Sequence, residues 1–246
     1  GKVALVTGGS RGIGAATCRA LAANGVRVGV VARRPDAIDA LVAELRALGV
    51  EAVGVSADCT ELASVERAAE RVTDALGPVD ILLPFAGGFG AFTPIAETSE
   101  TEWRQVIDAN LTATFLAVRV VVPAMIERER GVIVTMSSNG GRHLDKLLTA
   151  SYAAAKAGIV QFTRHIAKEL GPHGIRANAI APATVTSERI DRIMDDEGRA
   201  RTAALSPLGR LGTPEDCALA TLFLVSNASS WVTGVTLDVA GGRVML

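Results

Sequence analysis

Seven runs of apolar, largely β-branched residues alternate with amphipathic helical patterns along the chain. This alternation is typical of repeated β-α units, in which helices cover both faces of a parallel sheet. The predicted strands are Val3–Thr7, Val26–Val31, Glu51–Ser56, Val79–Leu83, Gly131–Met136, Arg176–Ala181 and Val235–Val239. The fold class is therefore α/β, with a seven-stranded parallel sheet.

The spacing of apolar residues also predicts where the helices begin. Their predicted starts lie near Gly12, Asp36, Glu61, Ser99, Ser151, Thr186 and Pro214. Nothing in the 246 residues demands a second domain, so we expect a single domain over 1–246. The stretch from Thr186 to Asp216 is charged, irregular and punctuated by proline and glycine. We interpret 186–216 as a substrate lid, with an ordinary solvated surface excursion as the alternative.

Composition narrows the class of partner. A formal net charge of −1 and the lack of a basic tract argue against nucleic acid and against an anionic membrane surface, which leaves a small molecule. Cys18, Cys59 and Cys217 are scattered and lack metal-ligand spacing, so we expect no metal site, no disulfide framework and a cytoplasmic location. The apolar stretch Phe115–Ile126 is interrupted by an arginine and a proline and falls short of a membrane span.

A glycine-rich turn joins the first predicted strand to the first helix. Glycines let the backbone turn tightly and approach a pyrophosphate, and the helix N-terminus directs backbone N–H groups at the same point. A tight turn without ligand is the alternative, but the strand–turn–helix context favours nucleotide binding. The predicted cofactor contacts in this turn are Gly8, Ser10, Arg11, Gly12, Ile13 and Gly14.

The end of the second strand bears on which nucleotide is bound. An acidic residue usually meets the ribose hydroxyls of NAD there, whereas this chain has Ala32, Arg33 and Arg34. Guanidinium groups pair with phosphate, so this sequence favours the 2′-phosphate of NADP(H), which Arg11 could also reach. Solvated arginines and NAD remain the alternative.

A tyrosine and a lysine stand four residues apart on a predicted helix. Tyr152 is the only tyrosine, and Lys156 shares its helix face, so an ammonium lies beside a phenol and favours the phenolate. Upstream, the fifth strand ends in Ser137-Ser138, which places a hydroxyl at the edge of the sheet where open α/β folds bind ligands.

Taken together, these motifs resemble the short-chain dehydrogenase/reductase family over essentially the whole chain. The glycine turn, the serines, Tyr152-Ala153-Ala154-Ala155-Lys156 and Gly241-Gly242 occur in the family's order. The resemblance implies a Rossmann-type, doubly wound three-layer sandwich. It also implies that Tyr152 is the proton donor or acceptor and that Ser138 binds the substrate oxygen. Lys156 would bind the nicotinamide ribose, and Asn110 would hold a water that leads protons to Lys156.

The same resemblance implies further contacts. The cofactor positions carried over from the family are Asp58, Cys59, Ala86, Gly87, Pro182, Val185 and Ser187, in addition to Asn110, Tyr152 and Lys156. His143, in the loop that also carries Arg142, Asp145 and Lys146, is interpreted as a substrate contact, beside Ser138 and Tyr152.

The chain departs from the family's pattern after the fourth strand. Two asparagines of the usual motif are replaced by Pro84 and Phe85, and a proline cannot donate to a ladder, so the strand is expected to end at or before Leu83. The usual glycine after Pro182 is Ala183, and the usual aspartate before the terminal glycines is Ala240.

The leading hypothesis is an NADP(H)-dependent reductase that converts a ketone or 3-oxoacyl-type carbonyl to an alcohol. Basic residues that would dock an acidic carrier protein are only weakly represented. An alcohol dehydrogenase working oxidatively and a non-catalytic nucleotide-binding scaffold are the alternatives. The resemblance implies a homotetramer or homodimer, packed through helices around Trp103–Met125 and Tyr152–Leu170, which carry Phe115, Leu116, Val120 and Phe162.

Overall fold

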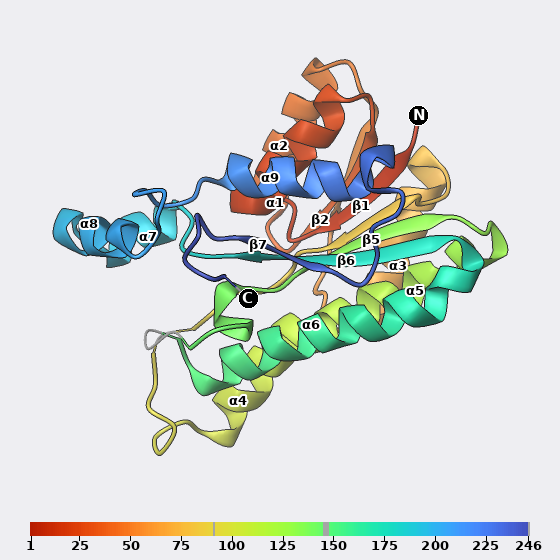
Figure 1. Cartoon of the computed structure of the whole chain (residues 1–246). Coiled ribbons are helices and arrows are strands. Elements are labelled where there is room, and N and C mark those ends of the chain that lie inside the picture. The colour runs from red at the N-terminus through yellow and green to blue at the C-terminus, as the bar shows by residue number, and fades with distance from the viewer. Residues whose placement is uncertain (91, 145–147, 246) are drawn as a thin grey trace.

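The computed structural model describes residues 1–90, 92–144 and 148–245. In this part of the chain a parallel sheet is ordered β3-β2-β1-β4-β5-β6-β7. The strands are β1 Val3–Thr7, β2 Arg27–Ala32, β3 Ala52–Ser56, β4 Ile81–Pro84, β5 Gly131–Met136, β6 Ile175–Pro182 and β7 Thr236–Val239. Helices lie on both faces of the sheet (Figure 1), so the predicted three-layer α/β architecture is confirmed.

Helices follow nearly every strand. Their bounds are α1 Gly12–Ala23, α2 Pro35–Ala47, α3 Leu62–Leu76, α4 Glu100–Ile107, α5 Ala113–Glu127, α6 Ala150–Leu170, α7 Glu188–Ile193, α8 Asp196–Ala204 and α9 Pro214–Val225. Short 3₁₀ turns lie at Asn139–Gly141, Gly171–His173 and Asn227–Ser229, and a π-helical turn at Asp108–Thr112. The predicted cap of α4 is present, because the Ser99 side chain accepts from the Glu102 backbone N–H and the Glu102 side chain accepts in return.

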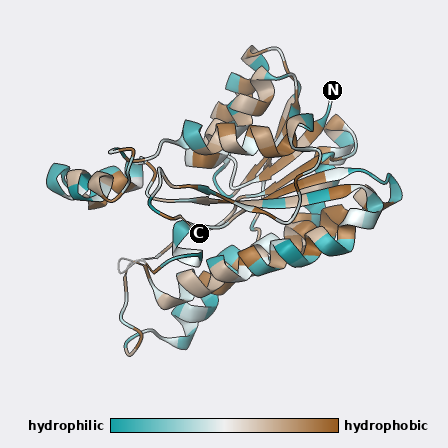
Figure 2. Cartoon of the chain, in the orientation of Figure 1, coloured by the Kyte–Doolittle hydropathy of each residue, from teal (hydrophilic) through white to brown (hydrophobic). Residues whose placement is uncertain are grey.

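Two hydrophobic cores hold the layers together, one on each face of the sheet. The first packs β-strand side chains such as Val30 and Leu83 against α1, α2 and α9, and the second packs Leu82 and Ile133 against α3, α5 and α6. Figure 2 shows mainly hydrophobic strands in the centre, between helices that carry both hydrophobic and hydrophilic residues. Burial on both faces explains why the strands read as continuous apolar runs in the sequence.

α4, the π turn and α5 form one continuous helical segment from Glu100 to Glu127. By length and composition alone this segment could cross a membrane, but half of its most apolar window is buried inside the protein. Leu116, Ala117 and Val121 pack in the core against α3 and the sheet. Core packing therefore accounts for the apolar character of this segment.

β4 runs one residue further than predicted, because Pro84 pairs in register with Thr7 of β1. The expectation that the strand ends at or before Leu83 was wrong. The Phe85 backbone N–H donates to the Thr7 carbonyl oxygen at 3.2 Å, so the ladder toward β1 continues past the proline. On the other side, pairing with β5 ends at Leu82 and Ile133. Pro84 is therefore the last residue of β4, paired with β1 on one side and with no strand on the other.

The segment 186–216 contains α7, which begins at Glu188 close to the predicted helix start near Thr186, then α8, which was not predicted, and the first residues of α9 at its end. A parallel bridge between Val185 and Gly212 ties its two ends together beside the sheet. In Figure 1 α7 and α8 project from the body of the protein as an arm beyond β6 and β7. The segment is therefore a helical excursion anchored at its base.

Candidate active site

The glycine turn lies between β1 and α1 and packs closely on the loop after β4. Gly8 has φ +66°, and a Cβ there would lie 2.7 Å from the Phe85 carbonyl oxygen. A Cβ at Gly14 would lie 2.3 Å from the Gly8 carbonyl oxygen. Side chains at these two positions would displace backbone, so glycine is required for the turn to form at all.

The N-terminus of α1 is suited to an anion. Its N-cap residue, Arg11, makes no side-chain capping hydrogen bond, and no acidic residue stands in the first turn. By contrast, α4, α6 and α9 have capping side chains that accept from their first-turn N–H groups. Gly12, with φ +51°, has open space where a Cβ would be. First-turn N–H groups that the N-cap side chain does not cap, together with the positive helix dipole, fit a nucleotide pyrophosphate, which Ser10, Ile13 and the glycines would surround.

Arg33 and Arg34 are exposed directly after β2. Arg33 lies near Asp58, which follows β3, the strand beside β2. Two hydrogen bonds from Thr60 hold the pKa of Asp58 below its usual range, and the charge of Arg33 lowers it further. The two arginines and Asp58 thus meet at the carboxyl ends of neighbouring strands, on the side where the adenosine half of a dinucleotide would lie.

The loop after β4 begins beside the glycine turn. The Ala86 backbone N–H donates to the Thr7 hydroxyl at 3.1 Å, and Gly87 has φ +147°. Cys59 is buried, and burial raises its thiol pKa to about 11. Ala86 and Cys59 therefore both lie against Thr7 at the end of β1, and Gly87 lies against Asn110. Their contacts with a cofactor stay predictions.

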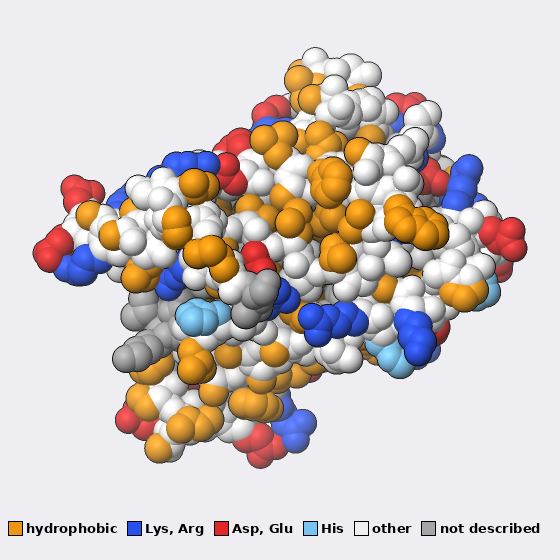
Figure 3. Space-filling model, in the orientation of Figure 1, with side chains coloured by type: hydrophobic (Ala, Val, Ile, Leu, Met, Phe, Trp, Pro, Cys, Tyr) orange, Lys and Arg blue, Asp and Glu red, His pale blue; other side chains and the backbone are white. Residues whose placement is uncertain are grey.

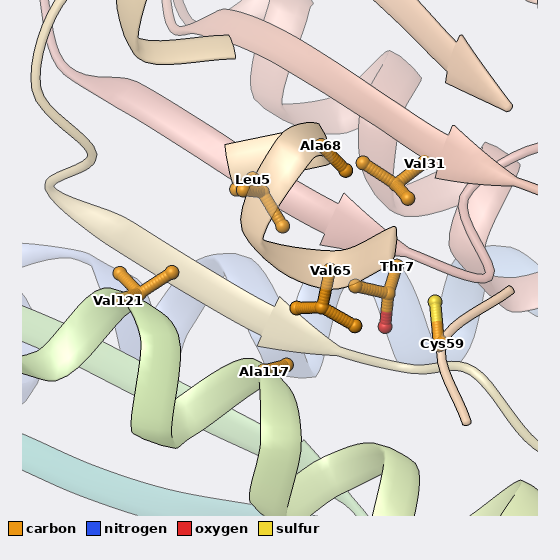
Figure 4. A pocket seen from close by; sticks show the side chains of 8 residues that line it. All are labelled: Leu5, Thr7, Val31, Cys59, Val65, Ala68, Ala117 and Val121. Atoms are coloured by element: carbon orange, nitrogen blue, oxygen red, sulfur yellow. The ribbon is translucent and has the colours of Figure 1, made fainter. Parts of the chain in front are cut away.

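Behind this region lies a small internal cavity of about 10 Å³ (Figure 4). Its walls are Leu5, Thr7, Val31, Cys59, Val65, Ala68, Ala117 and Val121. A space of this size holds about one water molecule. It is a packing gap below the sheet edge and is not the nucleotide site.

Tyr152 and Lys156 lie in the first two turns of α6. The Thr149 side chain caps the helix by accepting from the Tyr152 backbone N–H at 3.3 Å. Lys156 is 3% exposed, and its Nζ donates to the Met136 carbonyl oxygen at 2.9 Å and lies 5.5 Å from the centroid of the Tyr152 ring. Burial lowers the Lys156 pKa to about 7.

The serines after β5 are tied to the same helix. Ser137 Oγ donates to the Lys156 carbonyl oxygen at 2.8 Å, so it faces α6 and is committed to the backbone. Ser138 Oγ accepts from the Gly140 backbone N–H at 3.2 Å and donates to Asn139 Oδ1 at 3.3 Å. The Ser137 bond holds the end of β5, where Ser138 follows, against the part of α6 that carries Lys156. Ser137 is thus committed to the backbone, and the substrate contact of Ser138 stays a prediction.

Asn110 is fully buried in the π turn. Its Nδ2 donates to the carbonyl oxygens of Gly88 at 2.9 Å and Val106 at 2.8 Å, and its Oδ1 accepts from the Gly88 backbone N–H at 3.1 Å. π turns are frequent at functional sites. The amide thus fastens the loop after β4 to the helix, and the Asn110 carbonyl oxygen accepts from the Thr114 hydroxyl at 2.8 Å.

Phe89 is a contact that the sequence did not single out. Its ring meets the Tyr152 ring edge to face, with centroids 5.7 Å apart and an interplanar angle of 66°. The only signal in the sequence was that Phe89 stands within the glycine-rich run after β4. Phe89 and Lys156 together restrain the Tyr152 ring.

The remaining predicted residues lie at the end of β6 and in the segments that follow β5 and β6. Pro182 is buried at the end of β6, Val185 bridges to Gly212, and Ser187 caps α7 by accepting from the Ile190 backbone N–H at 3.2 Å. His143 is exposed, and its backbone N–H donates to the Asn139 carbonyl oxygen at 2.8 Å. Asp145 and Lys146 lie outside the described residues.

Arg142 crosses from this loop to the edge strand. Its Nε lies 2.8 Å from Asp238 Oδ1 of β7, in a largely buried ion pair whose Nε is not aligned for a hydrogen bond. The charge attraction at this distance does not depend on that alignment. The pair fixes the loop after Ser138 against β7. The described residues contain no group of three or more His, Cys, Asp or Glu side chains that could hold a metal ion.

Comparison with known proteins places this geometry in context. Residues 2–198 match the family model for short chain dehydrogenase. The chain is 36% identical over 252 residues to the 3-oxoacyl-[acyl-carrier-protein] reductase FabG of Escherichia coli, covering 100% of this chain and 98% of that protein. It is also 36% identical over 262 residues to the cyclohexanol dehydrogenase of Rhodococcus sp., covering 98% and 96%. A crystal structure of a 3-oxoacyl-[acyl-carrier protein] reductase from Brucella melitensis with bound NAD matches with a TM-score of 0.92 at 36% identity, covering 100% of this chain and 92% of that chain.

Proposed function

Because the chain belongs to the short-chain dehydrogenase/reductase family, whose members act on CH–OH and C=O groups with a nicotinamide cofactor, we propose a specific reaction for it. The protein is NADP(H)-dependent and reduces a ketone or 3-oxoacyl-type carbonyl to a secondary alcohol. The observation that carries the proposal is the buried set of Tyr152, Lys156 and Ser138 at the carboxyl edge of the sheet.

Each of these side chains has a chemical task in the proposed reaction. The nicotinamide supplies the hydride to the carbonyl carbon, or accepts it in the reverse direction. Ser138 Oγ would hydrogen-bond the substrate oxygen, and the Tyr152 hydroxyl would give that oxygen its proton, or remove it in reverse. The Lys156 ammonium would stabilise the phenolate left behind, and Asn110 would hold a water through which the proton is replaced.

The lysine is suited to this task by its surroundings. With a pKa near 7 it exchanges protons at neutral pH, and its low exposure keeps its electrostatic effect on Tyr152 unscreened. Only the Met136 carbonyl oxygen receives its hydrogen bond among the described residues. Ribose hydroxyls of a bound cofactor would add further acceptors for the ammonium, which supports the role proposed for Lys156.

The preference for NADP(H) is supported by Arg33 and Arg34, which are exposed where a 2′-phosphate would lie. The relative whose structure contains NAD is a reason to test both nucleotides. We propose to titrate the protein with NADPH and NADH in parallel, following tryptophan fluorescence. Tighter binding of NADPH supports the proposal, and equal binding or a preference for NADH contradicts it.

The acid–base role of Tyr152 is tested by Tyr152→Phe, which keeps the ring and removes the hydroxyl. We expect kcat for a responsive carbonyl to fall by about 10²–10⁴ while NADPH still binds. His165→Gln, on the exposed side of the same helix, is the matched control and should leave kcat unchanged. Retained turnover in Tyr152→Phe would exclude Tyr152 as the proton donor.

A second candidate is an alcohol dehydrogenase that works oxidatively, which the similarity to cyclohexanol dehydrogenase favours. Rates with NADP⁺ and a panel of secondary alcohols, compared with rates with NADPH and the corresponding ketones, separate the two directions. The panel should include a 3-oxoacyl thioester, because of the similarity to FabG. The non-catalytic scaffold predicts saturable NADPH binding with no turnover of any compound in this panel.

We also propose that the protein is a homo-oligomer and resides in the cytoplasm. Phe115, 43% exposed, and Phe162 of the neighbouring helix meet edge to face with ring centroids 6.5 Å apart on the outer side of α5 and α6, whereas Leu116 is part of the core. Figure 3 shows a second apolar surface over α9 and β7, where Phe223 and Trp231 are 44% and 100% exposed. Two separate apolar surfaces are what a homotetramer needs, whereas a homodimer needs one.

A further inference from the structure

Asn139 follows Ser138 and begins the 3₁₀ turn after β5. The residue is only 4% exposed, and its Oδ1 accepts from the Ser138 hydroxyl at 3.3 Å. Among the described residues its Nδ2 has no hydrogen-bond partner. A buried amide therefore lies beside the hydroxyl that would meet the substrate, with one of its two polar ends unpaired.

An unpaired polar end is costly in a buried position, because the group has left water without gaining a new partner. Turning the amide over does not remove the problem. Nδ2 would then donate to Ser138 Oγ, which frees the Ser138 proton for a substrate, but Oδ1 would lose its partner. In both orientations one end of the Asn139 amide is left without a partner among the described residues and is available for a group of the ligand.

The missing group must lie close to the reacting oxygen. Asn139 Oδ1 and Ser138 Oγ are 3.3 Å apart, and Nδ2 is joined to the same amide carbon as Oδ1. A ligand that puts one oxygen on Ser138 can reach the free end of the amide with an oxygen on the adjacent carbon. A hydroxyl suits this position best, since it both donates and accepts and so pairs with either end of the amide.

We propose that Asn139 binds a second oxygen of the substrate, and that the preferred substrates are α-hydroxyketones, which are reduced to vicinal diols. The inference rests on the proposed function and names the substrate class of the same site. Asn139 contacts the substrate and determines specificity, while Tyr152 and Lys156 transfer the proton. A simple ketone would leave the amide unpaired and would react more slowly.

The experiment compares acetoin, an α-hydroxyketone, with 2-butanone, which lacks the hydroxyl, at saturating NADPH. The wild-type protein should show a kcat/KM for acetoin at least about tenfold above that for 2-butanone, as one hydrogen bond to a buried group allows. Asn139→Leu, similar in size but apolar, should bring the ratio close to one, mostly through a higher KM for acetoin. Asn227→Leu, in the exposed 3₁₀ turn Asn227–Ser229, is the matched control and should keep the wild-type ratio.

The outcomes are distinguishable. No NADPH consumption with any carbonyl would overturn the proposed function and this inference with it. Turnover of both ketones by the wild-type protein without preference for acetoin would overturn the inference alone, and this result does not depend on whether Asn139→Leu folds. A changed Kd for NADPH in Asn139→Leu with an unchanged substrate ratio would also overturn it, because the amide would then face the cofactor.

Discussion

The Lys156 ammonium lies 5.5 Å from the centroid of the Tyr152 ring and donates its hydrogen bond to the Met136 carbonyl oxygen, not to an acidic side chain. A buried cation without a carboxylate partner is costly to the folded protein, and burial accordingly lowers its pKa to about 7. Such a cost to stability is expected of a group retained for the proposed reaction.

Replacing Lys156 with methionine should therefore stabilise the protein. The Lys156 pKa falls from 10.5 in the unfolded chain to about 7 in the folded one, which corresponds to about 5 kcal/mol. Below pH 7 the lysine is protonated in both the folded and the unfolded chain, so the buried ammonium destabilises the folded protein by the full amount. Between pH 7 and 10.5 the folded chain gives up the proton while the unfolded chain keeps it, so the cost shrinks as the pH rises and disappears above that range.

The measurement is a thermal melt of Lys156→Met and wild type at pH 6 and at pH 9. We expect a Tm increase of at least about 5 °C at pH 6, allowing for the lost bond to Met136, and a smaller increase at pH 9. Lys168→Met, at an exposed position of α6, should change Tm little at either pH. A Tm difference between Lys156→Met and wild type that grows with pH would contradict the idea that the buried ammonium destabilises the protein.

Removing Arg33 and Arg34 together should weaken NADPH binding and spare NADH. Loss of charge-assisted hydrogen bonds to a 2′-phosphate lowers affinity by about 10- to 100-fold, whereas NADH has no such phosphate. Parallel titrations of Arg33→Ala/Arg34→Ala measure both constants. Arg164→Ala, on the exposed side of α6, controls for the loss of positive charge alone. Equal losses for the two nucleotides would show that the arginines do not select NADPH.

Breaking the pair between Arg142 and Asp238 should destabilise the protein, because the two side chains are only 13% and 18% exposed. Asp238→Asn should lower the free energy of unfolding by about 1–3 kcal/mol, measured in urea. The double change Arg142→Asp/Asp238→Arg should recover part of this loss. Glu44→Gln, which breaks the exposed pair with Arg19, is the control and should cost less than about 1 kcal/mol. A similar loss in the free energy of unfolding for both variants would mean that burial does not strengthen the contribution of an ion pair to stability.

Introducing a charge on the exposed side of α5 should disrupt assembly. Phe115→Lys places an ammonium where two copies would meet through α5 and α6, so sedimentation velocity should show a smaller species than the wild type. Leu48→Lys alters an exposed leucine elsewhere, 52% exposed, and should leave the wild-type species unchanged. A monomeric wild-type protein would contradict the proposed assembly directly.

The sequence was most informative where a single periodic pattern determined the structure. Val3–Thr7 and Gly131–Met136 have the predicted bounds, because strands buried on both faces are apolar throughout and end at turn residues. The end of β4 was predicted one residue too early, because a proline ends a strand only where the neighbouring strand needs its N–H, and Pro84 still pairs with β1 but not with β5. Helix α7 begins at Glu188, close to the predicted start near Thr186, whereas α8 was missed because it shows no extended apolar period.

For the candidate site, the sequence identified residues but not their partners. The four-residue spacing of Tyr152 and Lys156 predicted a shared helix face, and both side chains lie on the buried side of α6. The contact of Phe89 with Tyr152 and the unpaired amide of Asn139 depend on how separate loops pack, which no local pattern encodes. The assigned site roles themselves stay predictions until the variants are measured.

The π turn at Asp108–Thr112 has a consequence for how the helical segment from Glu100 to Glu127 can change. A single wide turn shifts the phase of the helix, so the faces of α4 and α5 are set independently of each other. Deleting one residue there would let the segment run as one α-helix with little rotation of α4 relative to α5, because the five-residue π turn already falls about one residue, or about 100°, behind an α-helix. Substitutions in α4 can thus reshape the rim of the site while α5 keeps its place in the core.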